Sequence, residues 1–345
     1  MVRLLAALAL SLGLVQTGAV KALDIHFIDV EGGQSTLIVT PAGQSMLIDA
    51  GYASRNGVSR DADRIMAAVR EANLDHIDYL LVTHFHADHV GGVPELVNRI
   101  PIRTFIDYGE PLGTDRMANN PFKAYEPIRT QHPHIVPKPG DSLPIKGVEA
   151  EVVSAAGVLL AKPLPEGGRT NAIACASLEY QTEDGTENFR SIGVRFKFGA
   201  FRFLDLGDLS GNTLGKIVCP RNLIGDVSVY LVAHHGNYDS NVPAVLSAVR
   251  PRIAILNNGV TKGGAPEAFS TLRRQPGLED LWQMHASKHP GADNSVDALI
   301  ANVEGESDGN GLKLTATEDG SFTVLNKRTG FVKTYSAWAV AKGTR

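Results

Sequence analysis

The feature that most constrains the fold is a histidine-rich window that directly follows an apolar run. Residues 76–83 predict a buried strand, and the next residues read His-Phe-His-Ala-Asp-His-Val-Gly-Gly. Because alternate residues of an extended segment point the same way, His84 and His86 are able to hold one metal ion. Asp88 and His89 stand at the entry to the following helix, where they turn toward a second position. The window therefore predicts a layered chain that binds metal at the end of a strand.

Two later windows end in the same residue types. A strand-like run over residues 200–205 is followed by Gly207-Asp208, and an apolar run over residues 227–233 is followed by His234-His235-Gly236. Neutral imidazole nitrogens and carboxylate oxygens suit zinc, with manganese or iron as alternatives. No cysteine belongs to either window, so we expect a metal site without thiolate ligands.

Together these windows resemble the metallo-β-lactamase superfamily, whose signature is His-x-His-x-Asp-His between a strand and a helix. The run Leu47-Ile-Asp-Ala-Gly51 is similar to the family's early strand that ends in Asp-x-Gly. The resemblance covers essentially the whole mature chain. It implies an α/β (α+β) fold, a four-layer αβ/βα sandwich in a single domain, and it implies a metal-dependent hydrolase.

The resemblance also implies a set of roles. The implied metal ligands are His84, His86, Asp88, His89, Asp208 and His235. Asp208 would lie between two ions, most simply two Zn²⁺ with Mn²⁺ as the alternative, and Asp49 would support the histidines. Of the two neighbouring histidines we favour His235 as the ligand and expect His234 to face the substrate. Asp88, Asp208 and His234 are the expected catalytic residues, acting with a metal-bound hydroxide.

One departure separates this chain from the lactamases, glyoxalases and persulfide dioxygenases of the superfamily. Residues 169–180, where we expect a strand with the third histidine of the first metal, contain none and carry Asn171 instead. An Asn before such a strand, and the His-His-Gly tripeptide, are similar to the DNA-uptake competence proteins and the choline-phosphate esterases. We therefore expect a phosphoester or small ester substrate. The alternatives are lactone or β-lactam hydrolysis, and a metal-binding envelope protein without turnover.

Three residues outside the ligand set are candidates for substrate contact. Asn171 lies before the expected strand, Asn258 follows the strand run over residues 252–257, and His285 ends the run over residues 280–285. Strand ends feed the site edge in layered folds, which is the reason for choosing Asn258 and His285. Asn171 is chosen because of the resemblance to the competence proteins. His132 and His134 lie in a Pro-rich stretch, residues 104–139, which we interpret as a long loop.

The first 22 residues are typical of a cleaved secretory signal peptide. An apolar core of about twelve residues follows Arg3 and leads to a small-residue exit at Ala22, too short for a membrane span. We therefore expect a hydrolase domain over residues 23–345 and a periplasmic or extracellular protein, with no later transmembrane span. Cys175 and Cys219 are the two cysteines, and the sequence does not decide whether they pair.

Charge bears on the partner. The whole chain has 33 Lys and Arg against 37 Asp and Glu, a net charge of −4, which becomes −6 once Arg3 and Lys21 are removed. Without a basic stripe, capture of a nucleic acid is unfavourable, so we expect a small-molecule substrate. The sequence is silent on oligomeric state.

Overall fold

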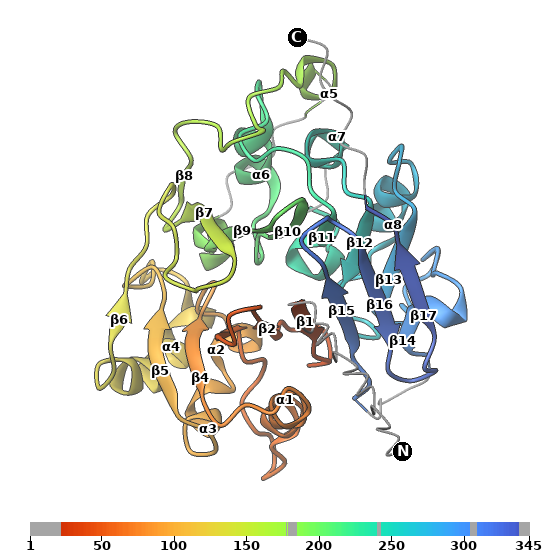
Figure 1. Ribbon diagram of the computed structural model, residues 1–345. Coiled ribbons are helices and arrows are strands. Elements are labelled where there is room, and N and C mark those ends of the chain that lie inside the picture. The colour runs from red at the N-terminus through yellow and green to blue at the C-terminus, as the bar shows by residue number, and fades with distance from the viewer. Residues whose placement is uncertain (1–21, 177, 179–184, 240–242, 304–308, 338–345) are drawn as a thin grey trace, which may run out of the picture.

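The computed structural model describes residues 22–176, 178, 185–239, 243–303 and 309–337, and two β-sheets packed face to face form its centre (Figure 1). The expected signal peptide falls outside the described residues except for Ala22. Within the described residues no helix is both long and apolar enough to cross a bilayer.

The first sheet has nine strands within the described residues, in the order β17-β16-β15-β1-β2-β3-β4-β5-β6. Its members are β1 (Leu23–Phe27), β2 (Thr36–Val39), β3 (Ser45–Ile48), β4 (Ile77–Leu81), β5 (Ile102–Ile106), β6 (His134–Ile135), β15 (Leu312–Ala316), β16 (Phe322–Asn326) and β17 (Val332–Tyr335). Strands β3 to β6 run parallel and the remaining pairs run antiparallel.

The second sheet has eight strands in the part of the chain that is described, in the order β14-β13-β12-β11-β10-β9-β7-β8. They are β7 (Glu149–Ala155), β8 (Val158–Leu159), β9 (Gly193–Phe198), β10 (Phe201–Asp205), β11 (Val229–Leu231), β12 (Ile253–Leu256), β13 (Asp280–His285) and β14 (Ile300–Asn302). Strands β10 to β14 run parallel.

Aromatic side chains fill the space between the sheets. The rings of Phe27 on β1 and Phe203 on β10 lie 5.8 Å apart, and Trp282 Nε1 on β13 donates to Tyr335 Oη on β17 at 2.9 Å. Central strands are buried on both faces, which explains their unbroken apolar runs.

Helices cover the outer faces. The first sheet carries α1 (Arg60–Glu71), α2 (Ala87–Val90), α3 (Val93–Leu96) and α4 (Arg116–Arg129), and the second carries α5 (Ala172–Ala176), α6 (Gly211–Val218), α7 (Pro243–Val249) and α8 (Pro266–Arg273). Three 3₁₀ turns complete the described elements, η1 (Glu187–Arg190), η2 (Ala233–Gly236) and η3 (Asp297–Leu299). The expected mixed α/β sandwich of two sheets is confirmed.

The prediction of a long loop over residues 104–139 was wrong. The segment contains the end of β5 and the helix α4, whose Asp115 caps the N-terminus by accepting Met117 N at 2.9 Å. Pro121 and Pro127 concealed this helix, because proline is normally unfavourable in a helix interior. Burial of Phe122 and Tyr125 on one face offsets that cost.

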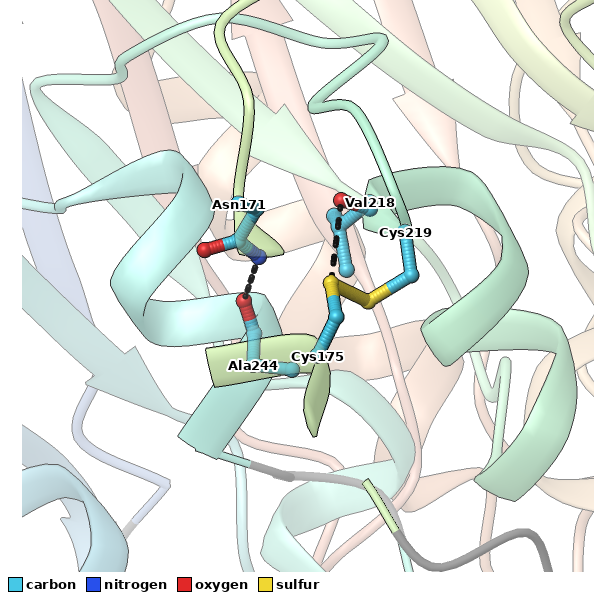
Figure 2. The surroundings of a disulfide bond; sticks show 5 residues. All are labelled: Asn171, Cys175, Val218, Cys219 and Ala244. Atoms are coloured by element: carbon cyan, nitrogen blue, oxygen red, sulfur yellow. Dashed lines mark hydrogen bonds between the residues drawn. A yellow bond between two sulfur atoms is a disulfide. The ribbon is translucent and has the colours of Figure 1, made fainter. Parts of the chain in front are cut away.

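The strand expected near residues 173–180 was also misplaced. Residues 172–176 form α5, and residues 177 and 179–184 lie outside the described residues. Cys175 on α5 forms a disulfide with Cys219 at the end of α6, so the two cysteines pair (Figure 2). Closing a loop between residues 44 positions apart removes conformational freedom from the unfolded chain.

A buried histidine on β1 makes stability depend on pH. Burial, together with the nearby Lys327 charge, lowers the pKa of His26 to about 4, from about 6.5 in an unfolded chain. Between these values the unfolded state binds more protons, so folding stability falls as pH drops from 6.5 to 4. We expect His26→Gln to remove a contribution of about 2 to 3 kcal/mol from that pH dependence, measured by urea unfolding at pH 7.5 and 4.5.

His132→Gln is the matched control, because His132 is exposed and lies outside this core. It should keep the pH dependence of the unmodified protein. An identical loss of stability on acidification in the His26→Gln variant would contradict the assignment.

Candidate metal centre

Four strand ends meet at one edge of the sandwich and carry the candidate ligands. Asp49 follows β3 and the 84–89 window follows β4, while Asp208 follows β10 and His235 follows β11. Strands β3 and β4 run parallel, as do β10 and β11, so their carboxyl ends deliver these side chains to a common place.

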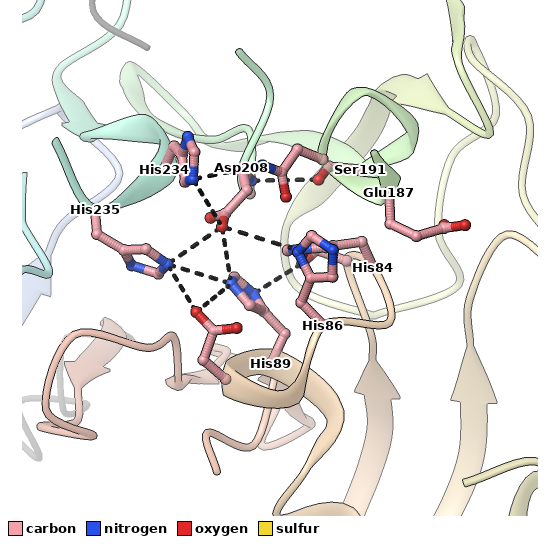
Figure 3. A network of polar contacts seen from close by, with 12 residues as sticks. His84, His86, His89, Glu187, Ser191, Asp208, His234 and His235 are labelled. Atoms are coloured by element: carbon pink, nitrogen blue, oxygen red, sulfur yellow. Dashed lines mark hydrogen bonds and ion pairs between the residues drawn. The ribbon is translucent and has the colours of Figure 1, made fainter. Parts of the chain in front are cut away.

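Asp88, His89, Asp208 and His235 converge on a single point, and all four are buried (Figure 3). His89 Nε2 lies 3.2 Å from Asp208 Oδ2, 3.5 Å from Asp88 Oδ2 and 3.3 Å from His235 Nε2. His235 Nε2 lies 3.3 Å from both carboxylate oxygens.

These separations fit a tetrahedral metal ion. Zinc bonds of about 2.0 to 2.1 Å place neighbouring ligand atoms about 3.3 Å apart. The second carboxylate oxygen of Asp208 is buried and accepts no hydrogen bond within the described residues. Two imidazoles and two carboxylates are also the donor set that zinc accepts. The group of four therefore fits the second of the two expected metal positions.

His84 and His86 form the other half of the centre. His84 Nε2 lies 3.0 Å from His86 Nδ1 and 3.8 Å from Asp208 Oδ2. Asp208 thus faces both groups of ligands, as expected for a carboxylate between two ions. The structure supplies two imidazoles and this one carboxylate here, a smaller donor set than at the other position.

A buried network behind His89 fixes the ring. Asp49 Oδ2 lies 2.7 Å from His89 Nδ1, and the same carboxylate accepts from Thr83 N and Thr83 Oγ1, each at 2.7 Å. Asp49 has a left-handed backbone, with φ of 58°. Such strain persists where surrounding contacts over-determine it, and it is typical of functional sites. Asp49 therefore lies where a supporting carboxylate is expected.

The backbone around the window is packed too closely for side chains. A Cβ on Gly33 would lie 2.4 Å from Asp88 O. Gln34 N donates to that same oxygen at 3.1 Å. The loop after β1 is thereby pressed against the turn that carries Asp88, which explains a glycine at position 33.

Sequence reasoning missed the carboxylate behind His86. Asp115, the N-cap of α4, has Oδ2 at 2.8 Å from His86 Nε2 and accepts from Glu187 N at 3.0 Å. Burial opposes ionisation, but the hydrogen bonds from Glu187 N and from His86 lower the pKa of Asp115. Because it accepts from Nε2, Asp115 leaves Nδ1 of His86 as the metal-facing nitrogen. Asp115 was missed because residues 104–139 were expected to form a loop, so no helix N-cap was expected there.

Burial and charge shape the protonation of the ligands. Burial and the neighbouring charge on His89 hold the pKa of His84 well below its usual range, which favours the neutral, ligating form. Burial also opposes ionisation of Asp208, but the charges of His235 and His89 hold its pKa well below the usual range. The centre therefore combines an ionised carboxylate with at least one neutral imidazole.

His234 stands apart from the ligands. Its Nε2 lies 3.9 Å from Asp208 Oδ2, and its Nδ1 lies 3.2 Å from Asp239 Oδ1. Asn188 Nδ2 approaches His234 Nε2 at 3.4 Å. Both histidines of the pair have positive φ, 50° for His234 and 54° for His235, and the turn aims only His235 into the group of four.

The structure does not bring Asn171 to the metal ligands. Its amide donates to Ala244 O on α7 at 2.9 Å, beside the disulfide (Figure 2). Asn188, three residues before Ser191, is the Asn that precedes a strand at the site, since β9 begins at Gly193. Ser191 Oγ accepts from Asp208 N at 3.3 Å. This Asn-x-x-Ser spacing before a strand was the signal that could have found Asn188.

Asn258 and His285 are buried supports rather than exposed contacts. The Asn258 amide donates to His285 O at 2.9 Å and to Gly259 O at 2.8 Å. His285 Nε2 lies 2.8 Å from Asp29 Oδ1. Both side chains are fully buried and bonded within the protein, and neither belongs to the group of four.

A lysine also missed by sequence reasoning reaches the centre from the loop after β12. Lys262 Nζ pairs with Asp88 Oδ2, and it donates to Tyr52 Oη at 2.9 Å. No motif around Lys262 predicted this contact, because the loop approaches Asp88 only through the tertiary fold.

Comparison with known proteins agrees with this geometry. Residues 28–168 match the family model described as the metallo-beta-lactamase superfamily, a range that contains the whole 84–89 window. Over this range the chain is similar to the metallo-β-lactamase superfamily, and its two-sheet α/β sandwich is consistent with that fold. The remaining proposed ligands, Asp208 and His235, lie beyond the matched range and are placed by the second sheet of that fold.

Several proteins resemble parts of the chain. The atrochrysone carboxyl ACP thioesterase of Emericella nidulans is 31% identical over 108 residues, 30% of this chain and 34% of that protein. The lactamase-like protein nscB of Neosartorya fischeri is 31% identical over 96 residues, 28% of this chain and 25% of that protein. The chain therefore spans about a third or less of the curated relatives that it matches.

Two solved structures are similar to parts of the chain at low identity. A diphosphatase from the PhnP family has a TM-score of 0.40 at 13% identity, covering 75% of this chain and 94% of that one. CmlA, a diiron β-hydroxylase from Streptomyces venezuelae, has a TM-score of 0.42 at 14% identity, covering 69% of this chain and 45% of that one. The superfamily fold does not by itself fix a reaction.

The contact behind His86 predicts an effect on metal affinity. Asp115→Asn keeps a good N-cap for α4 but places an amide where a carboxylate now accepts from His86 Nε2. We expect zinc affinity at the His84 and His86 position to fall about 10- to 100-fold, measured by competition with a chromogenic chelator.

Asp75→Asn serves as the control, since Asp75 is 93% exposed and pairs with the neighbouring His76. This control should leave the zinc affinity of both metal positions unchanged. If Asp115→Asn binds zinc as tightly as the unmodified protein, Asp115 does not position His86.

Proposed function

We propose that this protein is a secreted, metal-dependent hydrolase that holds two divalent cations, most simply Zn²⁺, and cleaves a phosphoester or small ester. One observation carries the proposal. At the carboxyl ends of the strands, the buried imidazoles of His84, His89 and His235 lie close to Asp88 and Asp208. The superfamily match supports the same class of chemistry.

Cations held at the two positions would supply Lewis-acid activation of the substrate and a nucleophile near neutral pH. Asp208 faces both positions with one carboxylate, so it keeps them close enough to act on one substrate. Mn²⁺ is the alternative occupant, because neither position contains a thiolate.

His234 is the proposed proton donor to the leaving group. It lies beside the centre, and Asp239 at Nδ1 orients the ring so that Nε2 faces the site. Asn188 lies against the same nitrogen and is suited to hold a substrate oxygen near it. A proton delivered at His234 Nε2 would neutralise the leaving oxygen.

The smaller donor set around His84 favours a substrate with an anionic or strongly polar reacting group. Two imidazoles and one carboxylate leave room for a substrate oxygen. We propose kinship with the branch of the DNA-uptake competence proteins and choline-phosphate esterases. The reason is the Asn that precedes a strand at the site, which is Asn188 and not Asn171. The thioesterases among the partial relatives make a thioester a reasonable form of the small ester.

Two alternatives have different consequences. Lactone or β-lactam hydrolysis would use the same centre, but it is disfavoured because no third histidine joins His84 and His86 within the described residues. A non-catalytic metal-binding envelope protein would hold metal without turnover. Nuclease activity is disfavoured by the net charge of −6 expected for the mature chain.

Export is proposed from the leader-like first 22 residues. The disulfide between Cys175 and Cys219 supports an oxidising compartment, because such bonds persist mainly outside the cytosol. On these two features together we propose a periplasmic or extracellular location.

Asp208→Ala tests the assignment. Metal analysis of the unmodified protein should give close to two ions per chain, and the variant should lose at least one. Turnover of bis-p-nitrophenyl phosphate, p-nitrophenyl phosphocholine, a thioester or a lactone should fall at least 1,000-fold, on the order of the loss expected for removed transition-state charge stabilisation.

His132→Ala is the matched control, and it should retain both metal and activity. Full metal content in Asp208→Ala would contradict the two-ion arrangement. Two bound ions with no turnover above a His84→Ala background would favour the binding protein over the hydrolase.

A further inference from the structure

We propose that the cavity beside Asp88 binds an anionic group of the ligand, held by Lys262 and Arg55. The inference deepens the proposed function by naming a substrate class. It rests on that function only for the reaction, which would take place at the neighbouring metal centre. The ligand would be a small ester or phosphoester with a carboxylate, sulfonate or phosphate away from the bond that is cleaved.

The cavity has a volume of about 820 Å³ and begins next to the metal centre. Ala87 and Lys262 form its inner wall, one residue from Asp88 along the chain and in contact with Asp88, respectively. Tyr52 and Val58 add apolar surface. Such a volume accommodates a small molecule, and a mixed lining of this kind is typical of ligand sites.

The wall of the cavity is rich in charged side chains, and most of its cations are paired with carboxylates of the protein. Four cations, Arg55, Arg60, Arg64 and Lys262, face two carboxylates, Glu31 and Asp61. A cation that lines a cleft without a carboxylate partner attracts small anions even when the net charge of the protein is negative.

The four cations differ in whether a carboxylate of the protein pairs with them. Arg60 pairs with Asp61, and Arg64 pairs with Asp29 and Glu31, so both are held by carboxylates of the protein. Lys262 also pairs with a carboxylate, that of Asp88, and donates to Tyr52, which leaves one of its three N–H donors for a ligand. Arg55 makes no ion pair within the described residues and is exposed. Its guanidinium is therefore available to a ligand carboxylate, sulfonate or phosphate, which it suits geometrically.

A tight turn presents Arg55. Arg55 N donates to Val58 O at 3.1 Å and Val58 N donates to Arg55 O at 3.0 Å, closing a two-residue turn over Asn56 and Gly57. Both central residues have positive φ, 53° and 75°, as a type I′ turn requires. The turn gives Arg55 a fixed backbone, which lowers the ordering cost of binding.

Lys262 is anchored to the metal centre by its own loop. A Cβ on the next residue, Gly263, would lie 2.1 Å from His235 O, and Gly264 N donates to that oxygen at 2.8 Å. The Lys262 side chain is 41% exposed and reaches both Tyr52 and Asp88. A ligand that spans the centre and the cavity would therefore meet the Lys262 ammonium beside the reacting bond.

Binding of 2-naphthalenesulfonate to the zinc-loaded full chain tests the proposal without requiring turnover. A sulfonate is a weak zinc ligand, and its neutral analogue 2-(methylsulfonyl)naphthalene has the same ring. By calorimetry we expect the sulfonate to bind at least about tenfold more tightly than the sulfone. Arg55→Met and Lys262→Met should each weaken sulfonate binding about tenfold, as for loss of a charge-assisted hydrogen bond.

The matched control is the double variant Arg70→Met, Lys162→Met, which removes two exposed cations elsewhere on the surface. It should bind the sulfonate like the unmodified protein. The zinc content and the thermal midpoint of Arg55→Met verify that this variant is folded and holds its metal. Both should be unchanged, because Arg55 is not among the residues proposed to bind the metal ions.

The outcomes separate this inference from the proposed function. No sulfonate binding, equal affinity for the sulfone, or unchanged affinity in Arg55→Met would overturn the anion pocket, even in an active hydrolase. Equal weakening in the control double variant would also overturn it, because the effect would then come from overall charge. Selective loss in Arg55→Met and Lys262→Met would support the pocket even if no ester were cleaved.

Discussion

The structure depends on a carboxylate, Asp208, that is buried among histidine rings and has almost no surface open to solvent. Removing an ionised group from water is unfavourable unless an opposite charge replaces the solvent. Asp208 Oδ2 lies 3.2 to 3.9 Å from the rings of His84, His89, His234 and His235. Bound cations would offset the cost of burying this carboxylate. The two sheets pack so that the ends of their strands bring these side chains together.

Rigid surroundings maintain the centre. Asp49 and Asp115 each orient a different histidine from behind, and the first of them adopts a left-handed backbone to do so. The same rigidity extends outward, because the loop of Lys262 is packed onto the turn of His235. Metal ligation and the recognition of a substrate anion are consequently properties of one connected set of loops.

Much of this arrangement was predictable from the sequence. The apolar run before His84 and the Gly207-Asp208 pair after the run over residues 200–205 identified the strand ends, because ligand residues at those ends leave a local signature. What sequence missed has a common cause. Asp115, Asn188 and Lys262 reach the site through tertiary packing, and their neighbours carry no periodic pattern. Proline in α4 and the helical start of residues 172–176 further concealed where the elements begin.

The central claim is that one cluster of side chains holds two cations around Asp208. Anomalous diffraction at the zinc edge from crystals of the zinc-loaded protein tests it most directly. We predict one peak among Asp88, His89, His235 and Asp208, and a second beside His84 and His86. A peak at the other carboxylate and histidine group, Asp29, Glu31 and His285, with none around Asp208, would contradict the account.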